Sequence, residues 1–104
     1  MPSLRKMRLS LSAERILEIV AADHGVESSI IVSRGTKAKT IRQMAIEFCY
    51  RYSPMTQREI GEIFGVDYST VSQNRKRLNE KLKSSRALRN QFEKIDHSIS
   101  GLSK

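Results

Sequence analysis

Apolar residues recur at helical spacing in several separate segments of the chain. In the first segment they are spaced i, i+3, i+4 and i+7, one face of an α-helix, and they are Ala13, Ile16, Leu17 and Val20. Ser12 is a suitable N-cap for this helix and Gly25 is a typical stop. Residues 26–32 (VESSIIV) would suit a strand by composition. In an otherwise helical chain we expect one or two helical turns there instead, with Val26, Ile30 and Ile31 turned inward.

A second apolar stripe predicts a long helix over about residues 39–52. Its members are Ile41, Ala45, Phe48, Cys49 and Tyr52. Pro54 ends this helix, because proline disfavours helical geometry in the residue before it. Thr56 and Glu59 then have the spacing of a capping box. They open a short helix that ends at Gly65 and whose inward face is formed by Ile60, Ile63 and Phe64.

Two more helices are predicted after the turn "VDYS". Asp67 or Ser69 can cap the first, whose inward residues are Val71, Leu78 and Leu82. The second follows Ser84 or Ser85, and its apolar stripe is Leu88, Phe92, Ile95 and Ile99. The chain is therefore predicted to be all-α, a compact domain of five to six helices over residues 12–100. It contains a helix-turn-helix at about 56–82 and follows a basic N-terminal arm, residues 1–11.

The helix after the turn has the polarity that a DNA-reading helix needs. In a helix-turn-helix, the second helix lies in the major groove with its N-terminal side chains at base edges. The small residues Gly61 and Gly65 allow the two helices to approach closely. The outer edge of the second helix carries hydrogen-bonding and basic groups, namely Tyr68, Ser69, Thr70, Ser72, Gln73, Lys76 and Arg77. This edge favours DNA reading over an ordinary helical hairpin with a solvated face. The nearby Asp67 can cap the helix, accept from a cytosine amine, or do both.

The charge of the chain points in the same direction. Nineteen Lys and Arg against eleven Asp and Glu give a net charge of +8. A small, strongly basic protein usually binds a polyanion, most often nucleic acid, although a solubility surface is the alternative. No acid occurs between Glu27 and Glu47, and only Glu80 interrupts the cations of residues 73–89, which are Arg75, Lys76, Arg77, Lys81, Lys83, Arg86 and Arg89. Together with the basic loop 33–42, they can make several phosphate contacts, and we expect binding to weaken steeply with salt.

The chain lacks the patterns of an enzyme. The single cysteine, Cys49, is interpreted as a core residue, and Tyr50 and Tyr52 as partly buried structural residues. The stretch "GTKAKT" lacks the first glycine and the spacing of a P-loop. We therefore expect no catalysis, cofactor, metal ion or small-molecule substrate. No apolar run approaches the length of a membrane span, and the N-terminus does not read as a signal peptide. We expect a cytoplasmic, nucleoid-associated monomer.

From about residue 13 to 99 the chain resembles the C-terminal DNA-binding domain of the bacterial replication initiator DnaA, a TrpR-like helix-turn-helix. The resemblance is carried by a helix, a short helix, a basic loop, the "RQMA" helix start and "IGEIFG". It implies that Arg42 enters the minor groove. It also implies that bases in the major groove are read after the turn by Asp67, Tyr68, Ser69 and Thr70. Phosphates are then held by Arg34, Lys37, Thr56 and Gln57. From the residue pattern we add Gln73 to the base contacts, and Lys39, Lys76 and Arg77 to the phosphate contacts.

The chain departs from the family at the turn, where "GVDYST" replaces "GGRDHTT". This shorter turn and the C-terminal tail look like the modules appended to some transposases of the repetitive-element-associated tyrosine type. His24 and His97 stand alone, so the paired-His metal motif of those enzymes is missing. We predict sequence-specific double-stranded DNA binding, by a regulator or by the module of a replication- or transposition-related protein. The alternative is a helical protein-interaction adaptor with a basic face.

Overall fold

Six helices form the regular structure of residues 11–32 and 39–102, the part of the chain that the computed structural model describes. They are α2 (Ala13–His24), α3 (Ser28–Val32), α4 (Lys39–Tyr52), α5 (Gln57–Phe64), α6 (Tyr68–Ser84) and α7 (Arg86–Leu102). The predicted all-α class is confirmed, and the helix-turn-helix is formed by α5 and α6. Among these helices, none has both the length and the apolar character that crossing a membrane requires. The predicted arm lies outside the described residues except for Leu11, whose N–H donates to the Tyr52 carbonyl at 2.8 Å.

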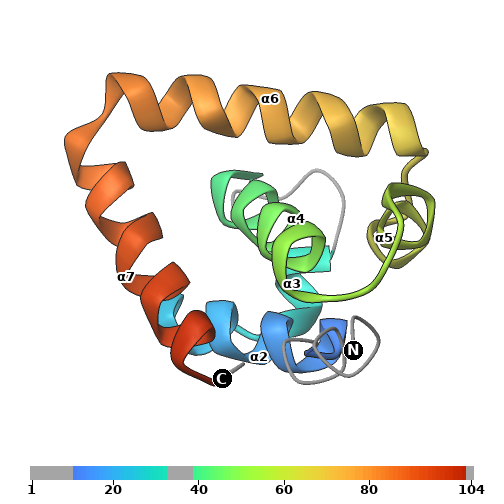
Figure 1. Cartoon of the computed structure of the whole chain (residues 1–104), viewed down its shortest axis with the longest axis horizontal. Coiled ribbons are helices and arrows are strands. Elements are labelled where there is room, and N and C mark those ends of the chain that lie inside the picture. The colour runs from blue at the N-terminus through green and yellow to red at the C-terminus, as the bar shows by residue number, and fades with distance from the viewer. Residues whose placement is uncertain (1–10, 33–38, 103–104) are drawn as a thin grey trace, which may run out of the picture.

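Helix α4 is the centre of the fold and packs against each of the other five helices (Figure 1). Helix α6 crosses one side of it, α7 turns back along the next, and α2 with α3 covers the side opposite α6. Because α4 is enclosed in this way, its burial extends beyond the predicted apolar stripe to the continuous run Gln43–Cys49. Two of these buried residues are polar, Gln43 and Glu47. Because burial removes most of their contact with water, both side chains need hydrogen-bond partners within the protein.

The predicted helix boundaries are confirmed by their capping contacts. The Ser12 hydroxyl accepts from the N–H of Arg15 at 3.1 Å at the start of α2. Thr56 and Glu59 form the expected capping box of α5, with bonds of 3.2 and 2.9 Å. The helices α2 and α5 both end at a glycine with positive φ: Gly25 at 66° and Gly65 at 70°. Glycine adopts this left-handed conformation without the steric cost of a Cβ.

Two sequence predictions about burial are wrong. Ile30 was expected to point inward, but it is 41% exposed, whereas its neighbour Ile31 is fully buried. Helix α3 has only five residues, of which Ile31 is the buried one, and adjacent side chains on a helix point about 100° apart, so Ile30 lies beside the face that Ile31 turns to the core. Tyr50 was expected to be partly buried but is 43% exposed. It directly follows the buried run Gln43–Cys49 and is the first residue after this run whose side chain is exposed.

The turn between α5 and α6 depends on a close backbone approach at Gly61. This residue is buried, and its carbonyl accepts from the N–H of Val66 at 2.8 Å. A Cβ built on Gly61 would overlap the carbonyl oxygen of Val66 and press on the backbone of Asp67. The obstacle is backbone rather than a flexible side chain, so the turn itself would have to move. The prediction that Gly61 allows the two helices to approach closely is confirmed.

We therefore expect Gly61→Ala to lower the free energy of unfolding by about 1–3 kcal/mol, the usual cost of overpacking a site that cannot relax. Urea denaturation followed by circular dichroism measures this. Gly101→Ala is the matched control, since a Cβ at Gly101 has nothing within 4 Å. Equal stability of the two variants would contradict the importance of the Gly61 contact.

Candidate nucleic-acid interface

The first turn of α6 is organised by the carboxylate of Asp67. Its Oδ1 atom accepts from the N–H of Thr70 at 2.8 Å and from the hydroxyl of Ser69 at 3.0 Å. The bonds from Thr70, followed by that from Ser69, hold the pKa of Asp67 below its ordinary value. Asp67 is therefore ionised near neutral pH and acts as the N-cap of α6. It also fixes the direction of the Ser69 hydroxyl.

The two edges of α6 have opposite character. On the inner edge, Val71 and Leu78 are fully buried. On the outer edge of the first two turns lie side chains that can donate or accept hydrogen bonds. Tyr68 is 63% exposed, Ser69, Ser72 and Gln73 are also exposed, and Thr70 is half-buried. The predicted base-contact residues after the turn thus share one accessible surface.

Arg42 lies on α4 and is half-buried. Its Nη2 atom donates to the carbonyl of Phe64, and its guanidinium lies over the Phe64 ring at 5.8 Å from the centroid. Phe64 is the last residue of α5, so this arginine compensates the carbonyl end of the helix directly before the turn. Its predicted position in the minor groove stays a prediction.

The predicted phosphate contacts lie on three elements. Lys39 is exposed at the start of α4, and Lys76 and Arg77 are exposed on α6. Thr56 is exposed at the N-cap of α5, where its hydroxyl accepts from Glu59 and can still donate to an anion. Gln57 is the half-buried first residue of α5. The two remaining candidates, Arg34 and Lys37, lie outside the described residues.

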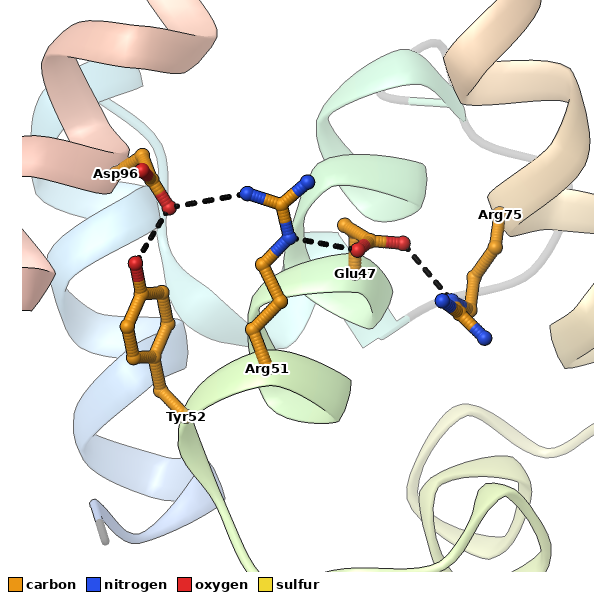
Figure 2. A network of polar contacts seen from close by, with 5 residues as sticks. All are labelled: Glu47, Arg51, Tyr52, Arg75 and Asp96. Atoms are coloured by element: carbon orange, nitrogen blue, oxygen red, sulfur yellow. Dashed lines mark hydrogen bonds and ion pairs between the residues drawn. The ribbon is translucent and has the colours of Figure 1, made fainter. Parts of the chain in front are cut away.

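A buried carboxylate links α4 to α6. Glu47 is 4% exposed. Its Oε1 atom accepts from Nε of Arg75 on α6 at 2.8 Å, and its Oε2 atom accepts from Nε of Arg51 on α4 at 2.7 Å (Figure 2). Each oxygen of the carboxylate therefore has a charged donor, which offsets the cost of removing the charge from water. The Arg75 guanidinium also lies 3.5 Å from the centroid of the Tyr50 ring.

The same network continues from α4 to α7. Nη1 of Arg51 is 3.4 Å from Oδ1 of Asp96, and the Tyr52 hydroxyl donates to that oxygen at 2.7 Å (Figure 2). Burial, followed by the bond to Asp96, raises the pKa of Tyr52 to about 12. The phenol consequently remains a donor at every physiological pH. Polar contacts thus connect α6, α4 and α7 in one chain.

A second polar link involves Gln43, which has no exposed surface. Its Nε2 atom donates to Oδ1 of Asn74 at 3.2 Å, and its Oε1 atom accepts from Nζ of Lys81 at 2.8 Å. Asn74 and Lys81 both belong to α6. Asn74 also donates to the carbonyl of Thr70 at 2.8 Å. This link therefore reaches the first turn of α6.

These contacts correct one expectation and add residues that the sequence analysis missed. Arg75 was counted among the cations available for phosphate, but its side chain is 24% exposed and is bonded to Glu47. Its positive charge is paired with the buried carboxylate of Glu47. Glu47 was missed as a functional residue. The available signal was its position four residues before Arg51, the spacing of a helical ion pair.

The fold and this surface define a helix-turn-helix domain of the DNA-binding class. The family model described as "Bacterial dnaA protein helix-turn-helix" matches residues 13–78. That span covers more than half of the chain and runs from α2 into α6, so the chain belongs to this family. DNA is accordingly the partner of the domain. A comparison with curated proteins gave no match.

We expect Glu47→Gln to lower the free energy of unfolding by about 2 kcal/mol. Removing one partner of a fully buried ion pair costs roughly 3–5 kcal/mol, and the 40% exposure of Arg51 reduces this penalty. The control is Glu18→Gln, because Glu18 pairs with Arg15 at the surface, where both side chains are more than half exposed. Its cost should stay below about 1 kcal/mol. Urea denaturation of both variants tests this, and an equal loss in the two would contradict it.

Proposed function

We propose that the protein binds double-stranded DNA at a preferred sequence, with the first two turns of α6 in the major groove. The observation that carries this proposal is the accessible surface formed by Tyr68, Ser69, Thr70 and Gln73 on the outer edge of a helix whose inner edge is buried. The major groove is about 12 Å wide and accepts a helix. Membership of the DnaA helix-turn-helix family supports the same partner.

In this proposal the base contacts come from both sides of the turn. Ser69, Thr70 and Gln73 offer hydroxyl and amide groups to base edges, and Tyr68 offers a ring edge and a hydroxyl. Asp67 already accepts two hydrogen bonds through Oδ1, so its Oδ2 atom is the acceptor for a cytosine amine. Arg42 enters the adjacent minor groove, for which it must exchange its bond to the Phe64 carbonyl for contacts to DNA.

The backbone contacts surround these base contacts. Lys39 on α4, Lys76 and Arg77 on α6, and the capped start of α5 at Thr56 and Gln57 hold phosphates in this proposal. The basic loop adds Arg34 and Lys37. Backbone contacts position a protein on DNA without carrying sequence information. Each one releases counterions, which makes the affinity depend on salt.

We further propose that the domain acts at the bacterial nucleoid as a monomer. It serves either as a regulator of transcription or as the DNA-binding module of a replication- or transposition-related protein. The turn "GVDYST" differs from the family's "GGRDHTT" at the positions of two base contacts, Tyr68 and Ser69. The initiator's own target sequence is therefore not part of the proposal.

Selection of binding sites from random duplexes is the experiment that tests this function. We expect a reproducible motif whose affinity exceeds that of scrambled DNA by several orders of magnitude at physiological salt. Binding with no preference for any sequence would overturn sequence-specific recognition. Absence of DNA binding, with retention of an acidic protein partner, would favour the adaptor function instead.

Ser69→Ala and Arg42→Ala should each reduce the discrimination between the selected motif and its single-base variants, by about 1–3 kcal/mol at one base pair. Competition binding against a panel of mismatched duplexes measures this. Asp67→Asn is a useful third variant because asparagine is also a good N-cap. It removes the charge while retaining the cap, so a changed preference at one base pair would reflect recognition rather than unfolding.

Lys76→Gln should behave differently, because Lys76 is proposed to contact phosphate. We expect affinity to fall equally for the motif and for scrambled DNA, and the slope of log K against log salt to become smaller by about one. Affinity measured between 50 and 200 mM salt tests this. A loss confined to the selected motif would instead assign Lys76 to a base.

A further inference from the structure

An open groove of about 630 Å³ lies between the start of α4, the middle of α6 and the corner where α6 meets α7. Its basic wall is formed by Lys39 from α4 and by Arg77 and Lys81 from α6. Ser84 and Ser85 line the corner. The groove is outside the surface of the first two turns of α6 that carries the proposed base contacts.

The cations of this groove form no ion pair with the described residues. Neither Lys39 nor Arg77 forms an ion pair with a described residue, and Lys81 is bonded only to the neutral oxygens of Thr40 and Gln43, at 3.2 and 2.8 Å. Glu80 also lines the groove, but it forms no ion pair with the described cations. Three cations at one groove therefore face solvent or a ligand without a paired carboxylate.

Lys81 is held in place by these bonds and still has capacity for a ligand. Its ammonium group has three N–H donors, of which two are used by Thr40 and Gln43. Burial, followed by repulsion from Lys39 and Arg77, lowers the pKa of Lys81. An anion bound between the three cations would relieve this repulsion. Its preferred chemistry is a phosphate oxygen, which accepts several charge-assisted hydrogen bonds at once.

The basic residues that α6 contributes to the groove lie on the same side of this helix as Thr70. Thr70, Arg77 and Lys81 are separated by seven and four residues, so they lie on the same side of α6. Seven residues of helix span about 10 Å, and the major groove is about 12 Å wide. A DNA strand that borders the major groove entered by the first turns of α6 would therefore come close to Arg77 and Lys81.

We propose that this groove binds a backbone phosphate of the recognised duplex, at a position next to the bases that α6 reads. The inference rests on the proposed function and adds to it a defined anion site that includes Lys81 and Ser85, whose oxygen accepts from the N–H of Leu88 and whose O–H can still donate. In this proposal Lys81 has a structural role and a DNA-binding role. It holds Gln43 on α4 with one N–H and contacts the phosphate with another.

The test uses the full chain and the selected duplex, in which one phosphate at a time is replaced by an uncharged methylphosphonate. In the parent protein, neutralising the phosphate held by the groove should weaken binding several-fold. In Lys81→Gln, the same replacement should weaken binding clearly less than in the parent, because Lys39 and Arg77 remain in the groove but Lys81 does not. The slope of log K against log salt should also be smaller by about one in this variant. Lys94→Gln is the matched control, because Lys94 is 75% exposed on α7 and pairs with Asp23 away from the groove.

Ser84→Asp guards against a folding defect in the lysine variant. It replaces neither Lys81 nor its partners Gln43 and Thr40, and it adds a negative charge to the groove. We expect it to weaken binding to the motif and to scrambled DNA equally. If both variants keep the salt slope and the methylphosphonate profile of the parent, the groove does not bind DNA. A poly-glutamate probe that binds the parent but not Lys81→Gln, with DNA binding unchanged, would overturn the inference in favour of an acidic peptide.

The failure of this inference can be distinguished from the failure of the proposed function. A parent protein without any preferred sequence contradicts the proposed function, whatever Lys81 contributes. A parent that selects a motif but shows no change on Lys81→Gln or Ser84→Asp contradicts the groove alone.

Discussion

The orientation of α6 depends on the ion pair between Glu47 and Arg75. Helix α6 has seventeen residues, and Val71 and Leu78 are its fully buried ones. Burying a side chain of this size contributes about 1.5–3 kcal/mol, and apolar contacts are not directional. The carboxylate of Glu47 is different, because each oxygen must keep its charged donor once water is excluded. A rotation of α6 about its axis would separate Arg75 from Glu47 and leave one oxygen of the buried carboxylate without its charged donor.

This constraint matters because the proposed recognition of DNA uses residues of two helices in a fixed relation. Arg42 belongs to α4, whereas Ser69 and Thr70 belong to α6. Glu47 and Gln43 join these helices at two points of α4 that are one turn apart. Gln43 and Glu47 are themselves buried, so water competes weakly for their hydrogen bonds. The polar contacts therefore determine which edge of α6 remains accessible, and the apolar core beneath them determines how close the helices lie.

The helices and their ends could be predicted from the sequence because the responsible contacts are local. The capping box of Thr56 and Glu59 spans three residues, and Gly65 ends α5 by its own backbone conformation. The role of Arg75 could not be predicted, because its partner Glu47 is 28 positions away and no periodicity relates the two. Arg75 appeared to be one more surface cation among those of residues 73–89. Ile30 was misjudged for a related reason: an apolar pair on a very short helix does not indicate which member faces the core.

The residues around the turn separate into structural and accessible ones. Gly61 is fixed by its contact with the backbone of Val66, and Asp67 is fixed by capping α6. Tyr68 has neither constraint, since it is 63% exposed. Substitution at Tyr68 changes the exposed surface of α6 at little cost in stability, whereas substitution of Asp67 by a residue that cannot cap costs about 1 kcal/mol. The "GVDYST" turn keeps the acid of the family's "GGRDHTT" and differs at the ring residue beside it. If Tyr68 contacts DNA as proposed, a substitution there changes the DNA contacts without disturbing the contacts that orient α6.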